Sequence, residues 1–347
     1  MDTILIRGIP PAAVMGLLLA IAPPVCADDA YYHLKDITIG GPTGTPSLSI
    51  DPKGRRLYLT HSSRIEVVDL ETGTTTFVTS PSAHSFVVAP KLNRGFVSDS
   101  RNGTVAVIDL ATMKTTASVK AGAGAASLLY EPAHDMVYAF STRTPSATIF
   151  DAGSGKVAAT VPLSAKPGPA AADSELGRVY CTLMEQNEIA VLDTRTHQVA
   201  GAWSVAPGKQ PAAVAVDTVN HRVFAACRNK QLVMLDGATG HFKASVAIGA
   251  GVDGAAFDPV THTAFCANSD GTATLVREET PDHLTLAQSL ATERNARIMA
   301  LDPLTHKIYL TTTDFEAQLP PDDGAAAKRP RTLPNSLKIL VYGPAGR

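Results

Sequence analysis

The sequence predicts an all-β fold, a seven-bladed β-propeller of four-stranded antiparallel blades whose ring is closed by the N-terminal strand pairing into blade seven. Three observations predict it. One segment recurs seven times at intervals of roughly 40 residues, the period of a propeller blade. Each repeat consists of short strand-like segments separated by turn residues. The two ends of the chain supply, between them, the strands that complete the last repeat.

The recurring segment is a turn residue, or its replacement, followed seven positions later by an aromatic residue, as in IDPKGRRLYL and LDPLTHKIYL. An aromatic ring at this point is expected to fill the space between neighbouring sheets, where the blades diverge. In chain order, the turn positions hold Asp51, Ala89, Glu131, Asp173, Asp217, Asp258 and Asp302. The aromatic positions hold Tyr58, Phe96, Tyr138, Tyr180, Phe224, Phe265 and Tyr309.

Each repeat is expected to supply four strands. The first is rich in small residues, as in Pro211 to Val216, because seven such strands crowd around one axis. The second carries the aromatic residue, and the third ends in an aspartate that begins a hairpin turn to the fourth. Few segments show a sustained 3.6-residue period, so helix is nearly excluded. The hairpin aspartates are Asp69, Asp109, Asp151, Asp193 and Asp236.

The chain ends indicate how the ring closes. After Tyr309 the chain has one more strand, Asn335 to Gly343, so blade seven lacks its outermost strand. Tyr31 to Gly41 resembles the fourth strand of blade five and precedes blade one, so we expect it to pair into blade seven and cover an open edge. Residues 28–347 are then a single propeller, with blades starting near 44, 83, 125, 167, 211, 252 and 296.

Residues 1–27 are expected to be a signal peptide. Arg7 precedes the apolar run Ala12 to Ala22, and Val25 and Ala27 stand where a signal peptidase reads before cutting. The run is about half of the ~20 residues that a membrane-spanning helix needs, which favours removal over anchoring. Lipoprotein cleavage before Cys26 is the alternative. Cleavage after Ala27 would leave a periplasmic or secreted protein without membrane insertion.

Composition excludes some classes of partner. The 30 basic and 32 acidic side chains give a formal charge of −2, so no nucleic acid is expected as a partner.

Three cysteines remain after cleavage, without CxxC spacing, and we expect buried free thiols at Cys181, Cys227 and Cys266.

Gly249 to Gly254 reads GAGVDG and fits the dinucleotide pattern GxGxxG. That pattern binds a pyrophosphate only where a helix follows the glycines. The repeat instead assigns the glycines to a crossover between blades five and six, with a strand after them. No cofactor is therefore expected.

Histidine recurs in the turns, at His134, His221, His262 and His306. The repeat puts each copy on a different blade, which favours turn residues over a metal cluster. No metal site is predicted, and no catalytic residue is assigned.

The loops that enter the first strands and the loops between second and third strands should emerge on one face, around the mouth of the central channel. Function usually collects on such loops. A solvated polar rim is the alternative interpretation of their polar residues. The predicted ligand-binding residues are His61, His84, Arg228, Asn229, Lys230, Asp253, Asn268, Asp270, Arg294 and Arg297.

The repeat with its VxVxD strands, together with ACRNK, IGAGVD, AFDP and ANSDGT, resembles the exported YVTN-repeat, or YncE-like, bacterial seven-bladed propellers. The resemblance covers roughly Tyr31 to Tyr342 and implies a periplasmic or secreted binding protein. Acidic residues often stand at the entries to blades one, three and four in that family. In this chain Pro46, Ala126 and Gly168 stand near those places, which puts metal-dependent activity in doubt.

Three functions compete. The first is a non-catalytic propeller, expected to be a monomer, that binds a periplasmic or envelope protein, a glycan or a small molecule at the channel mouth. The second is a lactonase-like hydrolase with His61 or His84 as base and an arginine, Arg228 or Arg297, steadying an anion. The third is a scaffold in a cell-envelope complex, which would expose an apolar patch.

Residues 315–334 form an insert in blade seven, rich in Pro and Ala between Leu319 and Pro334. Loops of this length are usually either functional or disordered. A mobile flap over the mouth and a disordered linker are both open at this point.

Overall fold

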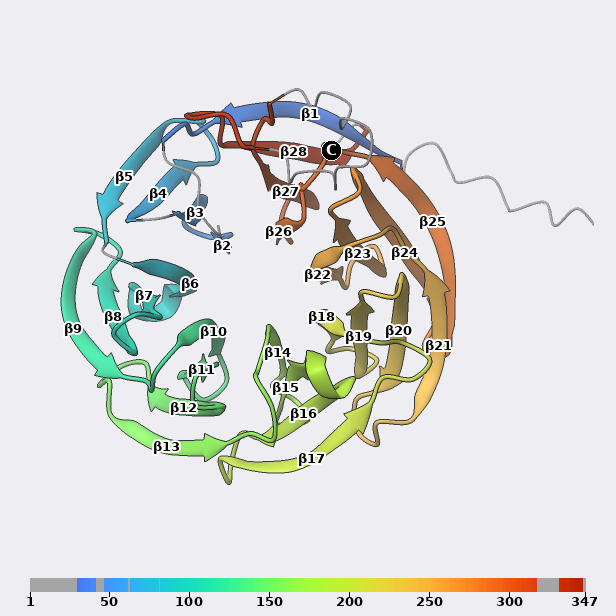
Figure 1. The fold of residues 1–347 in the computed structure, drawn as a ribbon, viewed down its shortest axis with the longest axis horizontal. Helices are drawn as coiled ribbons and strands as arrows, with labels where there is room; N and C mark the ends of the chain where they lie inside the picture. Colours follow the sequence, from blue (N-terminus) through green and yellow to red (C-terminus); the bar gives the residue numbers. More distant parts are fainter. Residues whose placement is uncertain (1–29, 42–46, 62, 81, 317–330, 346–347) are drawn as a thin grey trace, which may run out of the picture.

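The computed structural model describes residues 30–41, 47–61, 63–80, 82–316 and 331–345. These residues form seven four-stranded sheets arranged in a ring, with every strand pair antiparallel (Figure 1). The first strand of each blade lies nearest the centre of the ring, and the outermost strand follows the rim. The predicted fold class, a seven-bladed β-propeller, is confirmed. The predicted signal peptide, 1–27, lies outside the described residues.

The strands of the first four blades follow in chain order. Blade one is β2 (Ser47–Asp51), β3 (Arg56–His61), β4 (Arg64–Asp69) and β5 (Thr75–Thr79). Blade two is β6 (Ala83–Ala89), β7 (Arg94–Asp99), β8 (Thr104–Asp109) and β9 (Lys114–Lys120). Blade three is β10 (Ala125–Glu131), β11 (Met136–Ser141), β12 (Ser146–Asp151) and β13 (Val157–Pro162). Blade four is β14 (Ala170–Asp173), β15 (Arg178–Leu183), β16 (Glu188–Asp193) and β17 (Gln198–Ser204).

The remaining blades continue the same order, and blade seven takes its fourth strand from the N-terminus. Blade five is β18 (Pro211–Asp217), β19 (Arg222–Cys227), β20 (Gln231–Asp236) and β21 (Phe242–Ala247). Blade six is β22 (Val252–Asp258), β23 (Thr263–Asn268), β24 (Thr272–Thr280) and β25 (His283–Ala291). Blade seven is β26 (Ile298–Asp302), β27 (Lys307–Thr312), β28 (Lys338–Pro344) and β1 (Tyr31–Thr38).

Among the described residues, helix is limited to two short 3₁₀ turns, η2 (Pro90–Leu92) and η3 (Met184–Gln186). In the part of the chain that the structure describes, no helix is long and apolar enough to cross a membrane.

Strand β1 closes the ring by pairing with β28, in a register that runs from Tyr31 opposite Pro344 to Thr38 opposite Lys338. The Tyr31 ring also packs edge-on against Phe265 of blade six, with 5.2 Å between ring centroids. The side chain of Gln288, in the same blade, bonds the backbone of Tyr31 in both directions, at 2.9 and 3.0 Å. The N-terminal strand therefore completes blade seven and also fastens it to blade six, and the predicted closure is confirmed.

The repeated turns share one backbone conformation. In all seven repeats the residue four positions after the turn residue has a left-handed backbone, with φ between +50° and +65°. Gly, Asn, Asp and His are among the residues that tolerate this region best. Histidine recurs in these turns for this reason, as His221, His262 and His306 show. The seven positions hold Arg55, Asn93, Asp135, Gly177, His221, His262 and His306.

The hydrophobic core lies in the seams between neighbouring blades. All seven repeated aromatic residues are buried, and none is more than 3% exposed. Tyr58 of blade one stacks on Phe86 of blade two, with 4.8 Å between ring centroids. Phe96 of blade two meets Phe150 of blade three edge-on at 5.8 Å. One aromatic residue per repeat therefore fills one seam, as the repeat predicts.

Arginines reinforce several seams with polar contacts. The first residue of the second strand donates to a carbonyl just after the third strand of the next blade. Arg56 Nη1 donates to Leu110 O at 3.1 Å, and Arg178 Nη1 donates to Gly237 O at 3.0 Å. These bonds satisfy carbonyl groups at the hairpin turns and fix the spacing of adjacent blades.

A second set of seam contacts runs in the opposite direction, from a turn residue to a buried carboxylate of the preceding blade. His221 Nδ1 lies 2.8 Å from Asp173 Oδ2, and Arg55 Nη1 lies 2.7 Å from Asp302 Oδ2. His306 Nδ1 makes the same contact with Asp258 Oδ2 at 2.6 Å. The repeat predicts turn roles for these histidines, and the structure adds a contact between blades.

Substitution of Tyr180 tests whether the repeats are aligned correctly. Its ring is fully buried, and its hydroxyl donates to Gly237 O of the next blade at 2.7 Å. We expect Tyr180→Ala to lower the free energy of unfolding by about 3 to 5 kcal/mol, because it leaves a cavity in the seam. Tyr180→Phe, which removes only the hydroxyl, should cost about 1 kcal/mol. Denaturant unfolding measures both, and an unchanged midpoint for Tyr180→Ala would contradict the alignment.

Candidate functional site

The glycine-rich segment GAGVDG leads directly into a strand. Strand β22 begins at Val252 within the motif, and no helix follows, so the dinucleotide interpretation is excluded as predicted. Gly251 has φ of +73°, which favours glycine. A Cβ on Gly254 would lie 2.7 Å from the carbonyl oxygen of Arg297 in blade seven. Gly254 is thus needed for the close approach of two blades.

The mouth face is the face that carries the loops into the first strands and the loops between second and third strands. Four first strands are irregular where they start on this face. Their pairing registers skip His84 with Ser85 in blade two, and Ala126, Ala212 and Asp253 in blades three, five and six. A bulge leaves its residue outside the ladder and re-aims its side chain, a device that often occurs beside functional sites. Arg297, just before β26, holds the corresponding place in blade seven.

Three of the predicted residues come together at the mouth face. Asp253 lies between two arginines, with Oδ1 3.3 Å from Arg228 Nη2 and Oδ2 3.4 Å from Arg297 Nε. The three residues come from blade five, blade six and the loop that enters blade seven. Their side chains are between 24% and 43% exposed. We call these residues the Arg228–Asp253–Arg297 cluster.

Three other predicted residues build the loops around the cluster. Asn229 accepts from the backbone N–H of Lys209 at 2.8 Å and donates to Pro207 O at 3.2 Å. Asp270 Oδ2 accepts from Ala250 N at 2.5 Å. Lys230 turns the chain with φ of +63°, and its side chain is exposed. The carboxylate of Asp270 and the amide of Asn229 are therefore engaged in holding the loops.

The two remaining predicted residues of this region differ in exposure. Asn268 is fully buried, and its amide Nδ2 donates to Thr272 and Thr274 at 3.1 and 3.0 Å. Its Oδ1 has no hydrogen-bond partner in the described part of the chain. Arg294 is exposed, and its carbonyl oxygen accepts from the Thr312 hydroxyl at 2.8 Å. Asn268 thus belongs to the interior of blade six, whereas Arg294 lies on the surface.

The two histidines predicted for the mouth differ in setting. His61 is fully buried, with Nε2 2.8 Å from Glu66 Oε1. Its ring is therefore shielded from solvent. His84 is partly exposed, and its Nδ1 lies 2.7 Å from Ala126 O in blade three. The carbonyl can only accept, so Nδ1 carries a proton and donates it to Ala126 O.

Glu278 is a buried acid that the motif search missed. It is 4% exposed, and neither carboxylate oxygen has a hydrogen-bond partner among the described residues. Its backbone N–H donates to His262 O, the same bond that Leu110 and Gly237 make in their repeats. Burial, and then the nearby Asp217 carboxylate, raise the pKa of Glu278 to about 7, although Arg222 opposes this. The signal in the sequence is an acid at a position that other repeats fill with Leu, Ala, Thr or Gly.

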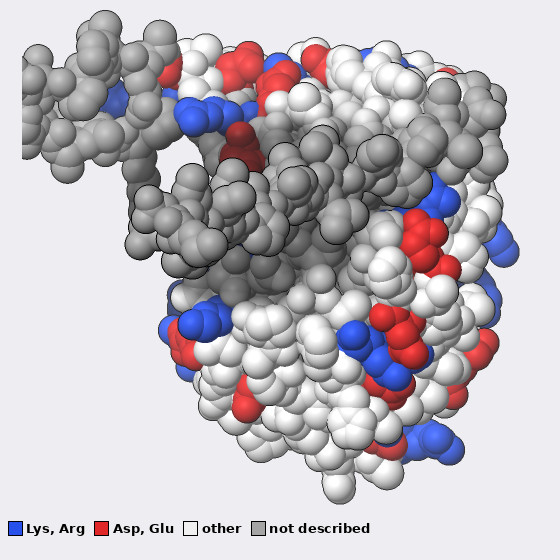
Figure 2. Space-filling view, turned by 90° about the vertical axis from the view of Figure 1, so that its right-hand side faces the viewer, with Lys and Arg blue, Asp and Glu red and all other residues white. Residues whose placement is uncertain are grey.

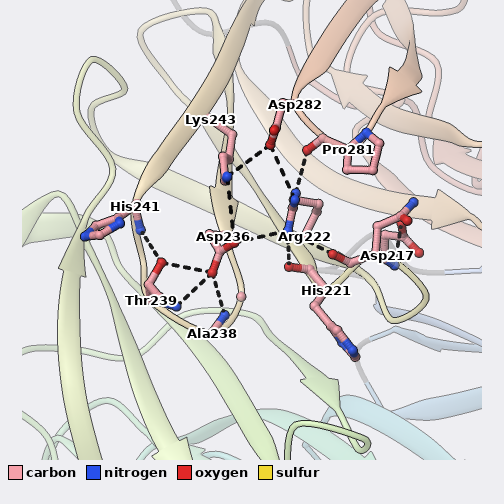
Figure 3. Close-up of polar contacts among 12 residues, drawn as sticks. Asp217, His221, Arg222, Asp236, Ala238, Thr239, His241, Lys243, Pro281 and Asp282 are labelled. Carbon is pink, nitrogen blue, oxygen red and sulfur yellow. Dashed lines mark hydrogen bonds and ion pairs between the residues drawn. The ribbon is translucent and has the colours of Figure 1, made fainter.

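Beside this acid, Arg222 is the hub of a polar network between blades five and six (Figure 3). Its guanidinium reaches Pro281 O at 2.5 Å, Asp236 Oδ2 at 3.2 Å and Asp282 Oδ1 at 3.4 Å. Lys243 also contacts the Asp282 carboxylate, at 3.1 Å. The network ties the long β24–β25 hairpin to blade five, on the face opposite the mouth. We assign it a structural role.

Charge on the rim is mixed. Figure 2 shows the side of the ring that carries β21 and β25, where acidic and basic side chains are interspersed and neither sign forms a large patch. Val219, Val260 and Leu304 are exposed on the turns of blades five, six and seven. Phe77, Phe242 and Leu286 are exposed as well, on the outermost strands of blades one, five and six.

The predicted free thiols and potential metal ligands can be located among the described residues. Cys181, Cys227 and Cys266 are buried free thiols, as predicted, and burial raises the pKa of Cys227 and of Cys266 to about 12. Thiols of this kind are unreactive at neutral pH. Within the described ranges, no group of three or more His, Cys, Asp or Glu side chains is placed to hold a metal ion.

The insert of blade seven is described only at its two ends. Phe315 and Thr332 form an isolated antiparallel bridge, and Glu316 N donates to Arg331 O at 2.8 Å. The rest of the predicted insert, residues 317–330, lies outside the described residues.

No protein-family model and no curated protein matches this chain. The assignment to a seven-bladed β-propeller therefore rests on the strand pairing and the ring, and the YVTN resemblance rests on the sequence phrases.

The raised pKa of Glu278 makes stability depend on pH. An acid whose folded-state pKa exceeds its unfolded value destabilises the fold progressively as pH rises from about 4.5 through 7. We expect Glu278→Gln to raise the free energy of unfolding at pH 8 by on the order of 2 kcal/mol, and by much less at pH 5. Denaturant unfolding at both pH values measures this difference.

The exposed neighbour Glu279 provides the matched control, because its carboxylate lies at the surface and accepts from the Thr285 hydroxyl. Glu279→Gln should change stability little at either pH. Equal effects of Glu278→Gln at pH 5 and pH 8 would show that burial does not hold this carboxyl protonated.

Proposed function

We propose that this protein is an exported, non-catalytic β-propeller that binds a ligand at its mouth face, and that it belongs with the YVTN-repeat propellers. The observation that carries the proposal is the Arg228–Asp253–Arg297 cluster. Residues far apart in the sequence, from two loops and the start of β22, meet there in partly exposed positions. Propellers commonly bind partners through the loops at one end of the ring.

Several features around the cluster support a binding role. Asn229 and Asp270 hold the adjacent loops through side-chain bonds to backbone N–H groups, so the loops are ordered before a ligand arrives. Gly254 allows blade seven to approach blade six closely enough for Arg297 to reach Asp253. Glu66 enclosing His61 disfavours the hydrolase alternative with His61 as its base.

Export is the second part of the proposal, and it rests on the apolar run before Ala27. When the full-length chain is expressed in a Gram-negative host, the mature protein should be recovered from the periplasm. Mass spectrometry of the intact protein should show Asp28 as its first residue. A mass that includes residues 1–27, or a lipid-modified Cys26, would contradict this part of the proposal.

The binding face is tested by site-specific photo-crosslinking in the periplasm. A photoreactive amino acid replaces Arg294 on the mouth face in one variant. In another it replaces Lys114, which begins β9 at the opposite face. We expect a discrete adduct from position 294 and none from position 114. The adduct should disappear when Arg228→Gln and Arg297→Gln are added, because these changes remove the cluster.

The Arg101→Gln change serves as the control, since Arg101 lies on the same face in the β7–β8 loop. It should leave the adduct intact. Identical adducts from both faces, or an adduct that survives loss of both cluster arginines, would count against the mouth face as the binding site.

A further inference from the structure

We propose that the ligand group bound at the mouth face is an oxyanion, a carboxylate or a phosphate, held by the guanidinium groups of Arg228 and Arg297. This inference rests on the proposed mouth-face site and names the chemistry that the site recognises. Two guanidinium groups share one carboxylate in the cluster, so the cluster carries one net positive charge. A bound anionic group would neutralise this positive charge.

The two arginines retain most of their hydrogen-bonding capacity. Arg228 uses Nη2, and Arg297 uses Nε, for their contacts with Asp253. A guanidinium has five N–H donors in a planar fork, and the structure assigns no other partner to either group among the described residues. The unused N–H edges suit the paired oxygens of a carboxylate or a phosphate, which arginine binds in a bidentate manner.

Asp253 positions both arginines. It contacts each with a different oxygen, and its place at the bulge of β22 sets it between the loop of blade five and the entry to blade seven. The side chains are therefore ordered in advance, which lowers the entropy cost of gathering two flexible arginines around a ligand. The contacts of 3.3 and 3.4 Å are long for charge-assisted bonds, so stronger bonds to a ligand remain available.

The surrounding residues favour an anion over a cation or a neutral group. The exposed side chains of Lys230 and Arg294 lie on loops next to the cluster and add positive charge. The nearby acid Asp270 accepts from the N–H groups of Ala250 and Thr272, and the basic side chains outnumber it and Asp253. The overall charge of −2 does not prevent anion binding, because the electrostatic potential at the site depends mainly on the nearby charged side chains.

Isothermal titration of the mature protein with citrate and with inorganic phosphate, in low-chloride buffer at pH 7, tests the inference. We expect saturable binding of at least one of the two probes. Affinity should fall at least tenfold in Arg228→Gln and in Arg297→Gln. Arg297→Lys, which keeps the charge but loses the fork, should also weaken binding. Arg101→Gln on the same face should bind as the parent does.

The two probes separate the sources of the oxyanion. Tighter binding of citrate indicates a carboxylate ligand, and tighter binding of phosphate indicates a phosphorylated one. Melting curves of each variant confirm that the fold is intact.

The inference is overturned if neither probe saturates, or if Arg101→Gln weakens binding as much as the cluster variants do. A mouth-face crosslink that persists without anion binding would remove the oxyanion inference alone and leave the binding face standing. Absence of a crosslink from position 294 in the protein with an intact cluster would remove the proposed function itself.

Discussion

The pairing of β1 with β28 is the constraint on which the rest of the structure depends. Without β1, the last blade would have three strands, and β28 would present an unpaired edge to solvent. In this chain the first strand completes the last blade, and Tyr31 continues the contact into blade six. Arg55 bridges blade one to Asp302 of blade seven across the same junction. Closure therefore fixes the angular position of every blade, including those that carry the cluster.

Once the ring is closed, one repeated unit supplies both the core and the framework of the site. Each repeat places an aromatic residue in a seam, a residue with a left-handed backbone in a turn, and in several blades an arginine on a neighbouring hairpin. The mouth face varies where the repeat permits it, at the residue that enters each first strand. That place holds histidine in blade two, alanine in blades three and five, aspartate in blade six and arginine in blade seven. The repeated core residues are thus similar in every blade, whereas the residue that enters the first strand varies. The charged ones, Asp253 and Arg297, lie on adjacent blades.

The sequence predicts the fold well because each structural role recurs at a fixed position. Aromatic residues such as Tyr58 and Tyr180 are identifiable from spacing alone, and so is the spare N-terminal strand. The candidate site is predicted only in part. Asp253 and the two arginines are recognisable as mouth residues, but their contact depends on a bulge in β22 and on the close approach at Gly254. His61 ends β3 on the mouth side of blade one, and its ring is buried beside Glu66. The charged Glu66 within the buried strand β4 is the signal for that pairing.

Hydrogen exchange of the native protein tests the closure of the ring most directly. Amides in β1 and β28 form one ladder, so the hydrogen-bonded amides of Tyr31–Thr38 should be protected to the same degree as those of Lys338–Pro344. Both should open with a free energy close to that of the inner strands of blade seven. Rapid exchange throughout β1, alongside full protection of β28, would show that the N-terminal strand does not close the ring and would contradict the dependence of the fold on this pairing.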